Sequence, residues 1–162
     1  MNISRKTLYI SGVAAAVGLM VAILFMFVFG NSGSASGEIV LRPSEYDLEN
    51  VPYEGGIVER EFTLENRGQN VLKINSIKTS CGCTEAQLVY KSDKSKKFGM
   101  HPNNIIWSQT IEPGDEAILR IFFDPTAHGP EGVGPFRRAV WLESSDPTNK
   151  KAEVRIEGTV VN

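Results

Sequence analysis

Apolar and charged side chains alternate in the stretch Ala152-Glu153-Val154-Arg155-Ile156-Glu157, near the end of the 162-residue chain. This period of two predicts a β-strand with one buried face and one solvated face. Gly158 interrupts the apolar set before Val160, which indicates a bulge or a close approach of another backbone segment. The stretch therefore favours a sheet that is packed on one side.

Similar short stretches precede it, and turn-forming residues separate most of them. They are residues 39–41, 57–65, 72–77, 118–123 and 139–142. No amphipathic helix pattern is visible after residue 37, so the fold class expected is all-β: an immunoglobulin-like β-sandwich of about seven strands. Its core is expected to rest on the packing of Phe62, Leu72, Ile74, Phe122, Trp141, Val154 and Ile156.

The N-terminal part of the chain has a different composition. Residues 8–29 carry no charge, and as a helix they would be roughly 33 Å long, enough to cross a hydrocarbon core of about 30 Å. Arg5 and Lys6 precede this run, so the positive-inside rule places residues 1–7 in the cytoplasm. An uncleaved transmembrane helix is expected, with cleavage by a signal peptidase near Ser36 as the alternative.

The rest of the chain is expected outside the cytoplasm. Residues 30–37 are rich in Gly and Ser and are typical of a flexible linker. Residues 38–162 are long enough for one domain of ordinary size. The predicted location is therefore the cytoplasmic membrane, with a single pass and a C-terminal domain that is periplasmic or extracellular. The lipid bilayer is the partner expected for residues 8–29.

Composition excludes several classes of protein. A hydrophobic fraction of 41% with 22% charged residues is not that of a mainly disordered chain. The net charge is −2 with scattered basic residues, so no nucleic-acid partner is expected. The hydrolase motifs GxSxG and HExxH do not occur. We therefore expect no cofactor and no enzyme activity, apart from a thiol-redox activity that the cysteines leave open.

The motif Ser80-Cys81-Gly82-Cys83-Thr84 is the one chemical signature of the sequence. Cys81 and Cys83 could form a structural pair, a redox-active disulfide or part of a soft-metal site. Candidates for a third metal ligand are remote in sequence: His101, His128 and Met100. No basic residue adjoins the thiols to stabilise a thiolate except Lys78, three residues earlier.

The domain resembles the bacterial immunoglobulin-like domain-of-unknown-function family numbered fifteen seventy-three. The stretches that carry the resemblance are Phe62–Gly68, Leu72–Ile74, Ser80–Thr84, Ile111–Asp115, Ile121–Pro125 and Ser144–Pro147. The resemblance implies an exported immunoglobulin-like sandwich without an established activity. It covers nearly all of the outer domain and leaves the function open.

The chain departs from that family pattern after the cysteine motif. An insertion of about 28 residues, 85–112, separates it from the Pro-Gly turn, where the family usually has a short link. The insertion holds a basic loop followed by an aromatic residue, and long loops in compact domains are often functional. Its candidates for partner binding are Lys94, Lys96, Lys97 and Trp107. The alternative is a solvated hairpin with Trp107 packed onto the sandwich.

Two functions remain open at this point. The first is a membrane-anchored, non-catalytic binding or scaffold module whose partner is another cell-envelope protein. The alternative is a thiol–disulfide exchange or copper-handling protein that uses Cys81 and Cys83. The metal ligands considered for the alternative include His101.

Overall fold

The computed structural model describes residues 36–101 and 106–162, together with Met20. Residues 36–162 form one compact unit. The predicted span 8–29 lies outside the described residues except for Met20, as do residues 1–7 and most of the predicted linker. No helix among the described residues is long and apolar enough to cross a membrane.

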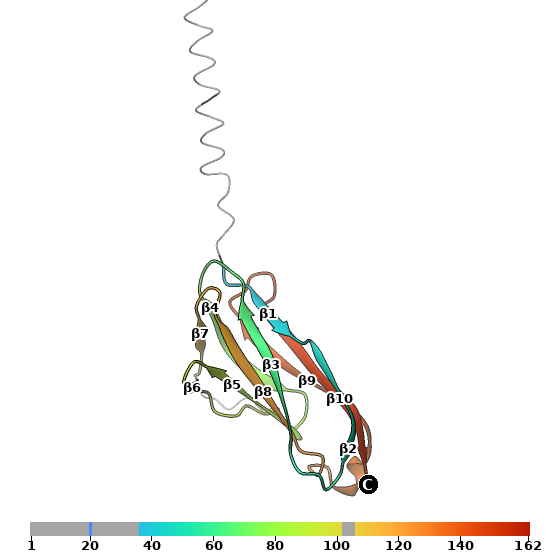
Figure 1. The fold of residues 1–162 in the computed structure, drawn as a ribbon. Coiled ribbons are helices and arrows are strands. Elements are labelled where there is room, and N and C mark those ends of the chain that lie inside the picture. The colour runs from blue at the N-terminus through green and yellow to red at the C-terminus, as the bar shows by residue number, and fades with distance from the viewer. Residues whose placement is uncertain (1–19, 21–35, 102–105) are drawn as a thin grey trace, which may run out of the picture. The chain divides into compact units, whose positions relative to one another are not determined.

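The compact unit consists of two packed β-sheets (Figure 1). The strands are β1 (Ile39–Arg42), β2 (Glu45–Pro52), β3 (Val58–Asn66), β4 (Leu72–Thr79), β5 (Thr84–Tyr90), β6 (Asp93–Lys94), β7 (Gln109–Ile111), β8 (Glu116–Phe123), β9 (Gly134–Ser144) and β10 (Lys151–Val161). One sheet has the order β1-β3-β8-β5-β6 and the other β2-β10-β9-β4-β7. A short 3-10 helix, η1 (Gly129–Gly132), precedes β9.

The topology is that of an immunoglobulin-like sandwich. The first strand is split: β1 pairs with β3 in one sheet, and β2 pairs with β10 in the other. The chain changes sheets around Pro43, whose peptide bond with Arg42 is cis. With β1 and β2 counted as one strand, β3, β8 and β5 complete one sheet and β4, β9 and β10 the other, as in an immunoglobulin domain. The predicted all-β sandwich is confirmed, with ten strands among the described residues rather than about seven.

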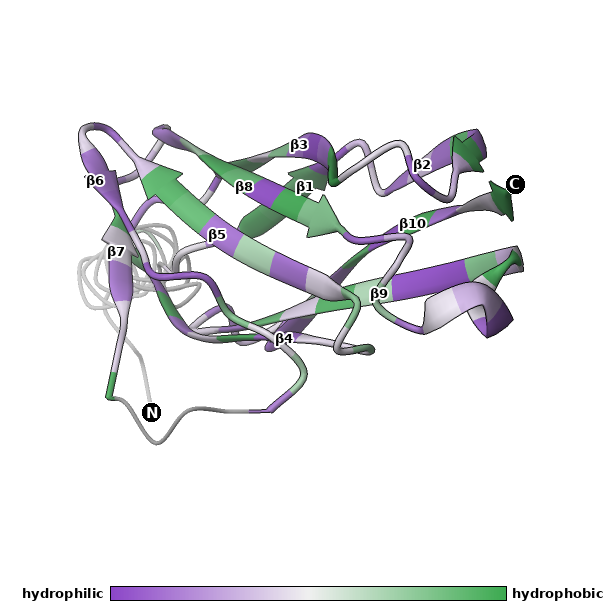
Figure 2. Ribbon diagram, turned by 90° about the horizontal axis from the view of Figure 1, so that it is seen from below, coloured by the Kyte–Doolittle hydropathy of each residue, from purple (hydrophilic) through white to green (hydrophobic). Residues whose placement is uncertain are grey.

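Alternation of apolar and polar side chains builds the core between the sheets. Figure 2 shows hydrophobic and hydrophilic segments succeeding one another along β5 and β9. Five of the seven predicted core residues are at most 1% exposed: Phe62, Leu72, Ile74, Val154 and Ile156. Gly158 marks the predicted irregularity, because the β2–β10 register shifts there and a Cβ would lie 2.9 Å from the carbonyl oxygen of Glu49.

The other two predicted core residues, Phe122 and Trp141, are only partly buried. In β8 the inward positions include Ile121 and Phe123, so Phe122 faces outward, where the Lys97 ammonium lies 3.8 Å from its ring centroid. In β9, Trp141 faces outward and its indole N–H donates to Glu153 at 2.8 Å. These core predictions were wrong because an adjacent apolar residue occupies the inward position.

The predicted insertion 85–112 contains a strand of the sheet rather than a loop alone. It begins inside β5, which pairs with β8 from Thr84 to Val89. Ala86 and Leu88 are 0% and 2% exposed, so β5 contributes to the core. The extension proper therefore starts after Tyr90.

Two buried polar side chains, Asn66 and Asp146, hold the loops at one end of the sandwich in place through hydrogen bonds. The Asn66 side-chain oxygen accepts the N–H groups of Glu38 and Gly68, and its amide donates to the carbonyls of Asn70 and Ile111. These four distances lie between 2.9 and 3.1 Å. All four hydrogen-bonding positions of the Asn66 side chain are thus satisfied by backbone.

The carboxylate of Asp146 likewise accepts hydrogen bonds from loop backbone. Burial disfavours its charge, but hydrogen bonds from the N–H of Ile39, the hydroxyl and N–H of Thr148 and the N–H of Asn149 outweigh this effect. The pKa of Asp146 therefore lies below its ordinary value. We call Asn66, Asp146 and their partners the polar end.

Candidate functional site

The cysteine motif forms one of the connections between the two sheets. Strand β4 belongs to one sheet and β5 to the other, and residues 81–84 join them in a tight turn. The Thr84 N–H donates to the carbonyl oxygen of Cys81 at 3.2 Å, and the Thr79 hydroxyl donates to the same oxygen at 3.0 Å. The turn is therefore fixed from both sides, at the opposite end of β4 from Asn66.

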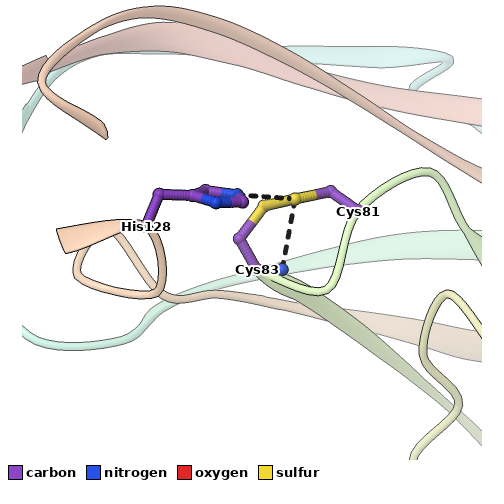
Figure 3. Close-up of side chains that lie close together, drawn as sticks. All are labelled: Cys81, Cys83 and His128. Atoms are coloured by element: carbon purple, nitrogen blue, oxygen red, sulfur yellow. Dashed lines mark hydrogen bonds between the residues drawn. A yellow bond between two sulfur atoms is a disulfide. The ribbon is translucent and has the colours of Figure 1, made fainter. Parts of the chain in front are cut away.

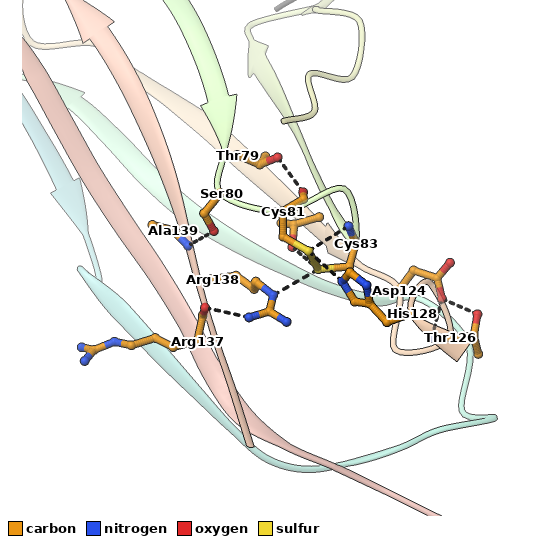
Figure 4. Close-up of a disulfide and its surroundings, with 11 residues drawn as sticks. Thr79, Ser80, Cys81, Cys83, Asp124, Thr126, His128, Arg137, Arg138 and Ala139 are labelled. Atoms are coloured by element: carbon orange, nitrogen blue, oxygen red, sulfur yellow. Dashed lines mark hydrogen bonds between the residues drawn. A yellow bond between two sulfur atoms is a disulfide. The ribbon is translucent and has the colours of Figure 1, made fainter. Parts of the chain in front are cut away.

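Cys81 and Cys83 are joined by a disulfide across this turn (Figure 4). Their Cα atoms are 5.2 Å apart, which lies within the range that a disulfide needs. Cys83 is 3% exposed and Cys81 is 9% exposed. The bridge thus lies at the edge of the core, with Cys81 nearer to solvent.

The loop after β8 brings His128 to the disulfide. A carboxylate oxygen of Asp124 accepts the N–H and the hydroxyl of Thr126 at 2.9 and 2.7 Å, which starts the loop. Gly129, at φ +65°, closes it with an N–H bond to the Thr126 carbonyl at 2.8 Å. The imidazole of His128 then points toward the bridge, with its Nε2 atom 3.0 Å from Cys81 Sγ (Figure 3).

Arg138 of β9 contacts the other sulfur. Its Nε donates to Cys83 Sγ at 3.1 Å, and its Nη1 donates to the carbonyl oxygen of Arg137 at 3.0 Å. The guanidinium also lies 5.9 Å from the ring centroid of Phe136. Burial lowers the pKa of Arg138 from its ordinary value, but an arginine keeps its charge at neutral pH. Cys83 therefore has a cation beside it.

The two sulfurs consequently differ in their surroundings. Cys81 Sγ contacts an exposed imidazole, and Cys83 Sγ contacts a half-buried guanidinium. A positive charge stabilises a thiolate, so Cys83 is the better leaving group if the bridge is opened. We call Cys81, Cys83, His128 and Arg138 the sulfur site.

The flanking residues of the motif have structural contacts. Ser80 continues the pairing of β4 with β9, because its N–H and hydroxyl both contact the backbone of Ala139 at 2.9 Å. Thr84 is fully buried, and its hydroxyl lies 3.5 Å from Cys83 Sγ. Gly82 is exposed, and a Cβ there would meet nothing within 4 Å. The turn therefore does not require glycine for steric reasons.

The predicted partner-binding residues lie around the segment that follows β5. Lys94 is exposed, and Lys97 pairs with Glu85 at 3.2 Å. Lys96 is half-buried with its ammonium 5.2 Å from the ring centroid of Phe98. Trp107 packs against the core and against Phe98, with ring centroids 4.7 Å apart. Trp107 is thus a packing residue in addition to any role in recognition.

The sequence offered His101, His128 and Met100 as candidates for a third metal ligand, and no basic residue adjoined the cysteines except Lys78. In the described part of the chain, the group of metal-ligating side chains is Cys81, Cys83 and His128, and His101 is not a member. Arg138 was not predicted at all. Arg138 belongs to β9, 55 residues from Cys83 in the sequence. The pairing of β4 with β9, continued by Ser80 and Ala139, brings β9 past the motif.

The comparisons with known proteins agree on the fold. Residues 39–98 match the family described as "Protein of unknown function (DUF1573)". The match supports the resemblance in that region, and the motifs quoted after residue 98 lie outside it. No curated protein matches the chain.

Several solved structures share the arrangement of strands at low sequence identity. A protein of unknown function from Porphyromonas gingivalis W83 has a TM-score of 0.59 and 18% identity, and the similarity covers 81% of this chain and 50% of that one. The VesB protease of Vibrio cholerae has a TM-score of 0.50 and 14% identity, with 83% and 35% covered. This chain thus spans half of the first protein and about a third of the second. At these identities the similarity concerns the fold alone.

Proposed function

We propose that the chain is a membrane-anchored, extracytoplasmic binding module that recognises another cell-envelope protein and catalyses no reaction. The two-sheet sandwich and the match to a family of unknown function support a binding module. The uncharged run of residues 8–29, preceded by Arg5 and Lys6, supports the anchor and its orientation.

The observation that carries the proposal is an ordered basic edge beside β5. Phe98 and Ala86 exchange two backbone hydrogen bonds of 2.8 Å, and the Ser95 N–H donates to the Leu88 carbonyl at 2.8 Å. These bonds extend the sheet past β5 as far as residue 98. Lys94 and Lys97 are exposed along this edge.

The chemistry of the edge indicates the kind of partner. Lysines on an edge discourage pairing with another strand, so the edge suits side-chain recognition of an acidic surface. A surface that is already ordered binds without the entropy cost of ordering a loop. We therefore expect an acidic patch of an envelope protein to contact Lys94 and Lys97.

A photo-crosslinking residue in place of Lys94, in the full chain in native membranes, tests this proposal. A discrete crosslinked protein is expected, and the charge reversal K97E in the same chain is expected to reduce its yield at least about tenfold. Photo-crosslinking from Lys150, an exposed lysine of another loop, is the control. Equal products from both positions, or none from Lys94, would overturn the proposal.

Thiol–disulfide exchange at Cys81–Cys83 is a second candidate, favoured by the cation beside Cys83. An external thiolate attacks Cys81 Sγ and forms a mixed disulfide, while the bridge breaks and Cys83 leaves as a thiolate beside Arg138. A second external thiolate then attacks the sulfur of the first external thiol. The Cys81 thiolate leaves, the two external thiols become a disulfide, and the protein gains two electrons.

The mixed disulfide distinguishes this candidate from a purely structural bridge. Brief exposure of the protein to reduced glutathione, followed by acid quenching and peptide mass spectrometry, is expected to find glutathione on Cys81 and not on Cys83. Failure of mild thiols to open the bridge would make it structural. That result would leave the binding module unaffected.

A further inference from the structure

We propose that the reduced sulfur site binds one copper(I) ion, with Cys81 Sγ, Cys83 Sγ and His128 Nε2 as its ligands. Like thiol–disulfide exchange, the second candidate function, this inference requires that the Cys81–Cys83 disulfide can be reduced, and it rests on that function in no other way. It is independent of partner binding by the basic edge.

Three potential ligand atoms converge at one place. The two Sγ atoms and an imidazole nitrogen of His128 all lie within 4.8 Å of one another. They come from the turn after β4 and the loop after β8, and Figure 3 shows the imidazole directed at the bridge. The loop that carries His128 is held by the bonds of Asp124 and Gly129, so its ligand is positioned in advance.

Reduction converts the bridge into two ligands. Two molecules of a small thiol reduce it and leave as their disulfide, which supplies two electrons and two protons to the cysteines. Binding of the metal then displaces those protons, because thiolates are the ligands. At a metal–sulfur distance of about 2.3 Å, two sulfurs on one ion are about 4 Å apart. The Cα separation of 5.2 Å accommodates this spacing.

The ligand set selects a soft ion. Thiolate ligands bind copper(I) and zinc in preference to harder ions, and imidazole binds both metals as well. A structural zinc site is closed by four ligands, whereas the sulfur site offers three in the described part of the chain. Three ligands of this kind complete a trigonal copper(I) site.

Charge also favours a monovalent ion. The guanidinium of Arg138, 3.1 Å from Cys83 Sγ, supplies one positive charge to the site. Two thiolates, this guanidinium and copper(I) together are neutral, whereas a divalent ion leaves an excess positive charge beside a half-buried arginine. Arg138 therefore disfavours zinc relative to copper(I).

The ion has a route to the ligands. Gly82, between the cysteines, is exposed, with nothing within 4 Å of the place where a Cβ would be. His128 is exposed as well. A small copper donor can therefore reach the sulfurs from the turn side without opening the core.

The test uses the full chain in detergent, reduced with a small dithiol under anaerobic conditions and freed of reductant. A thiol assay first establishes two free thiols per chain. Titration with copper(I) against a chromogenic chelator is then expected to give one ion per chain. X-ray absorption is expected to show sulfur and nitrogen neighbours of the copper.

Matched variants assign the ligands. His128→Gln is expected to weaken copper(I) binding at least about tenfold, and C83S to abolish the competition with the chelator. His101→Gln, which changes the other histidine of the chain, is expected to bind as the unchanged protein does. Two free thiols without copper binding, equal affinities of the two histidine variants, or displacement of copper(I) by zinc would overturn the inference. The first outcome leaves thiol exchange intact, whereas a bridge that resists reduction excludes both.

Discussion

The polar end and the sulfur site lie at opposite ends of β4, and they use polar atoms in opposite ways. At the polar end, the hydrogen bonds of Asn66 and Asp146 are made with backbone and loop groups of the domain itself. At the sulfur site, the side chains of His128 and Arg138 converge on two sulfurs, and the imidazole is open to solvent. A site whose polar groups are all satisfied internally stabilises the fold. The sulfur site instead holds a disulfide at the edge of the core beside an exposed imidazole, and it is the site for which we propose chemistry.

The largest expected effect is that of Asn66→Ala at the polar end. The substitution removes four hydrogen bonds, one of them to the buried carbonyl of Ile111 and three to part-buried backbone groups, so we expect a loss of about 3 kcal/mol in the free energy of unfolding. Urea denaturation measures it. Gln69→Ala, at an exposed position of the same turn, is the control and should change stability by less than about 0.5 kcal/mol. Similar losses from both variants would contradict a stabilising role for Asn66.

Asp146→Asn should have the next largest effect and should depend on pH. Because the folded-state pKa of Asp146 is lowered, its charge stabilises the fold fully above the unfolded value of about 4. This contribution disappears as the pH falls through the lowered folded pKa. We expect the variant to be about 1–2 kcal/mol less stable at pH 7, with the difference shrinking in acid. A difference that is the same at pH 7 and pH 2 would refute this account.

At the sulfur site, Arg138→Gln should slow the chemistry more than it weakens the fold. Loss of the cation beside Cys83 is expected to slow opening of the bridge by a small thiol about tenfold, because the leaving thiolate is less stable. Stopped-flow or quenched alkylation measures the rate. Arg137→Gln removes a neighbouring exposed arginine that pairs with Glu45, and it should leave the rate unchanged. Equal rates for the two variants would show that Arg138 does not act on the bridge.

Much of this fold could be predicted because period-two patterns report which face of a strand is buried. The sheets around Phe62, Ile74 and Val154 follow from that pattern. It fails where two apolar residues are adjacent, as at Phe122 and Phe123, because sequence alone does not fix which one faces inward. Strand β5 was missed because it lies in a segment interpreted as an insertion, although Ala86 and Leu88 alternate correctly.

The cysteine pair of the sulfur site was visible in sequence. His128 was one of three candidate third ligands that no pattern could choose between, and Arg138 was not predicted. His128 lies 47 residues from Cys81 and Arg138 lies 55 residues from Cys83, so no local spacing connects them. Their approach follows from the pairing of β8 with β5 and of β9 with β4. At the polar end, two of the four hydrogen bonds of the Asn66 side chain are local, to Gly68 and Asn70, and the other two, to Glu38 and Ile111, could not be read from the sequence either.

The smallest expected effect is that of Gly82→Ala. A Cβ at Gly82 meets nothing within 4 Å, so stability should change by less than about 0.5 kcal/mol and the bridge should still form. Urea denaturation and intact mass check both points. Gly158→Ala is the matched contrast, because a Cβ there lies 2.9 Å from the Glu49 carbonyl oxygen and should clearly destabilise the domain. Equal sensitivity at both glycines would contradict the packing of β2 against β10.

The pairing of β2 with β10 also determines how the domain resists mechanical force. The two strands are parallel, with Glu45 opposite Arg155 and Pro52 opposite Val161. A pull on β2 from its start and on β10 from its end therefore acts along the ladder in opposite directions. The hydrogen bonds between β2 and β10 therefore bear the force at the same time, in shear, and do not break one after another. A domain tethered at one terminus and pulled at the other would hold as a clamp until this strand pair slides apart.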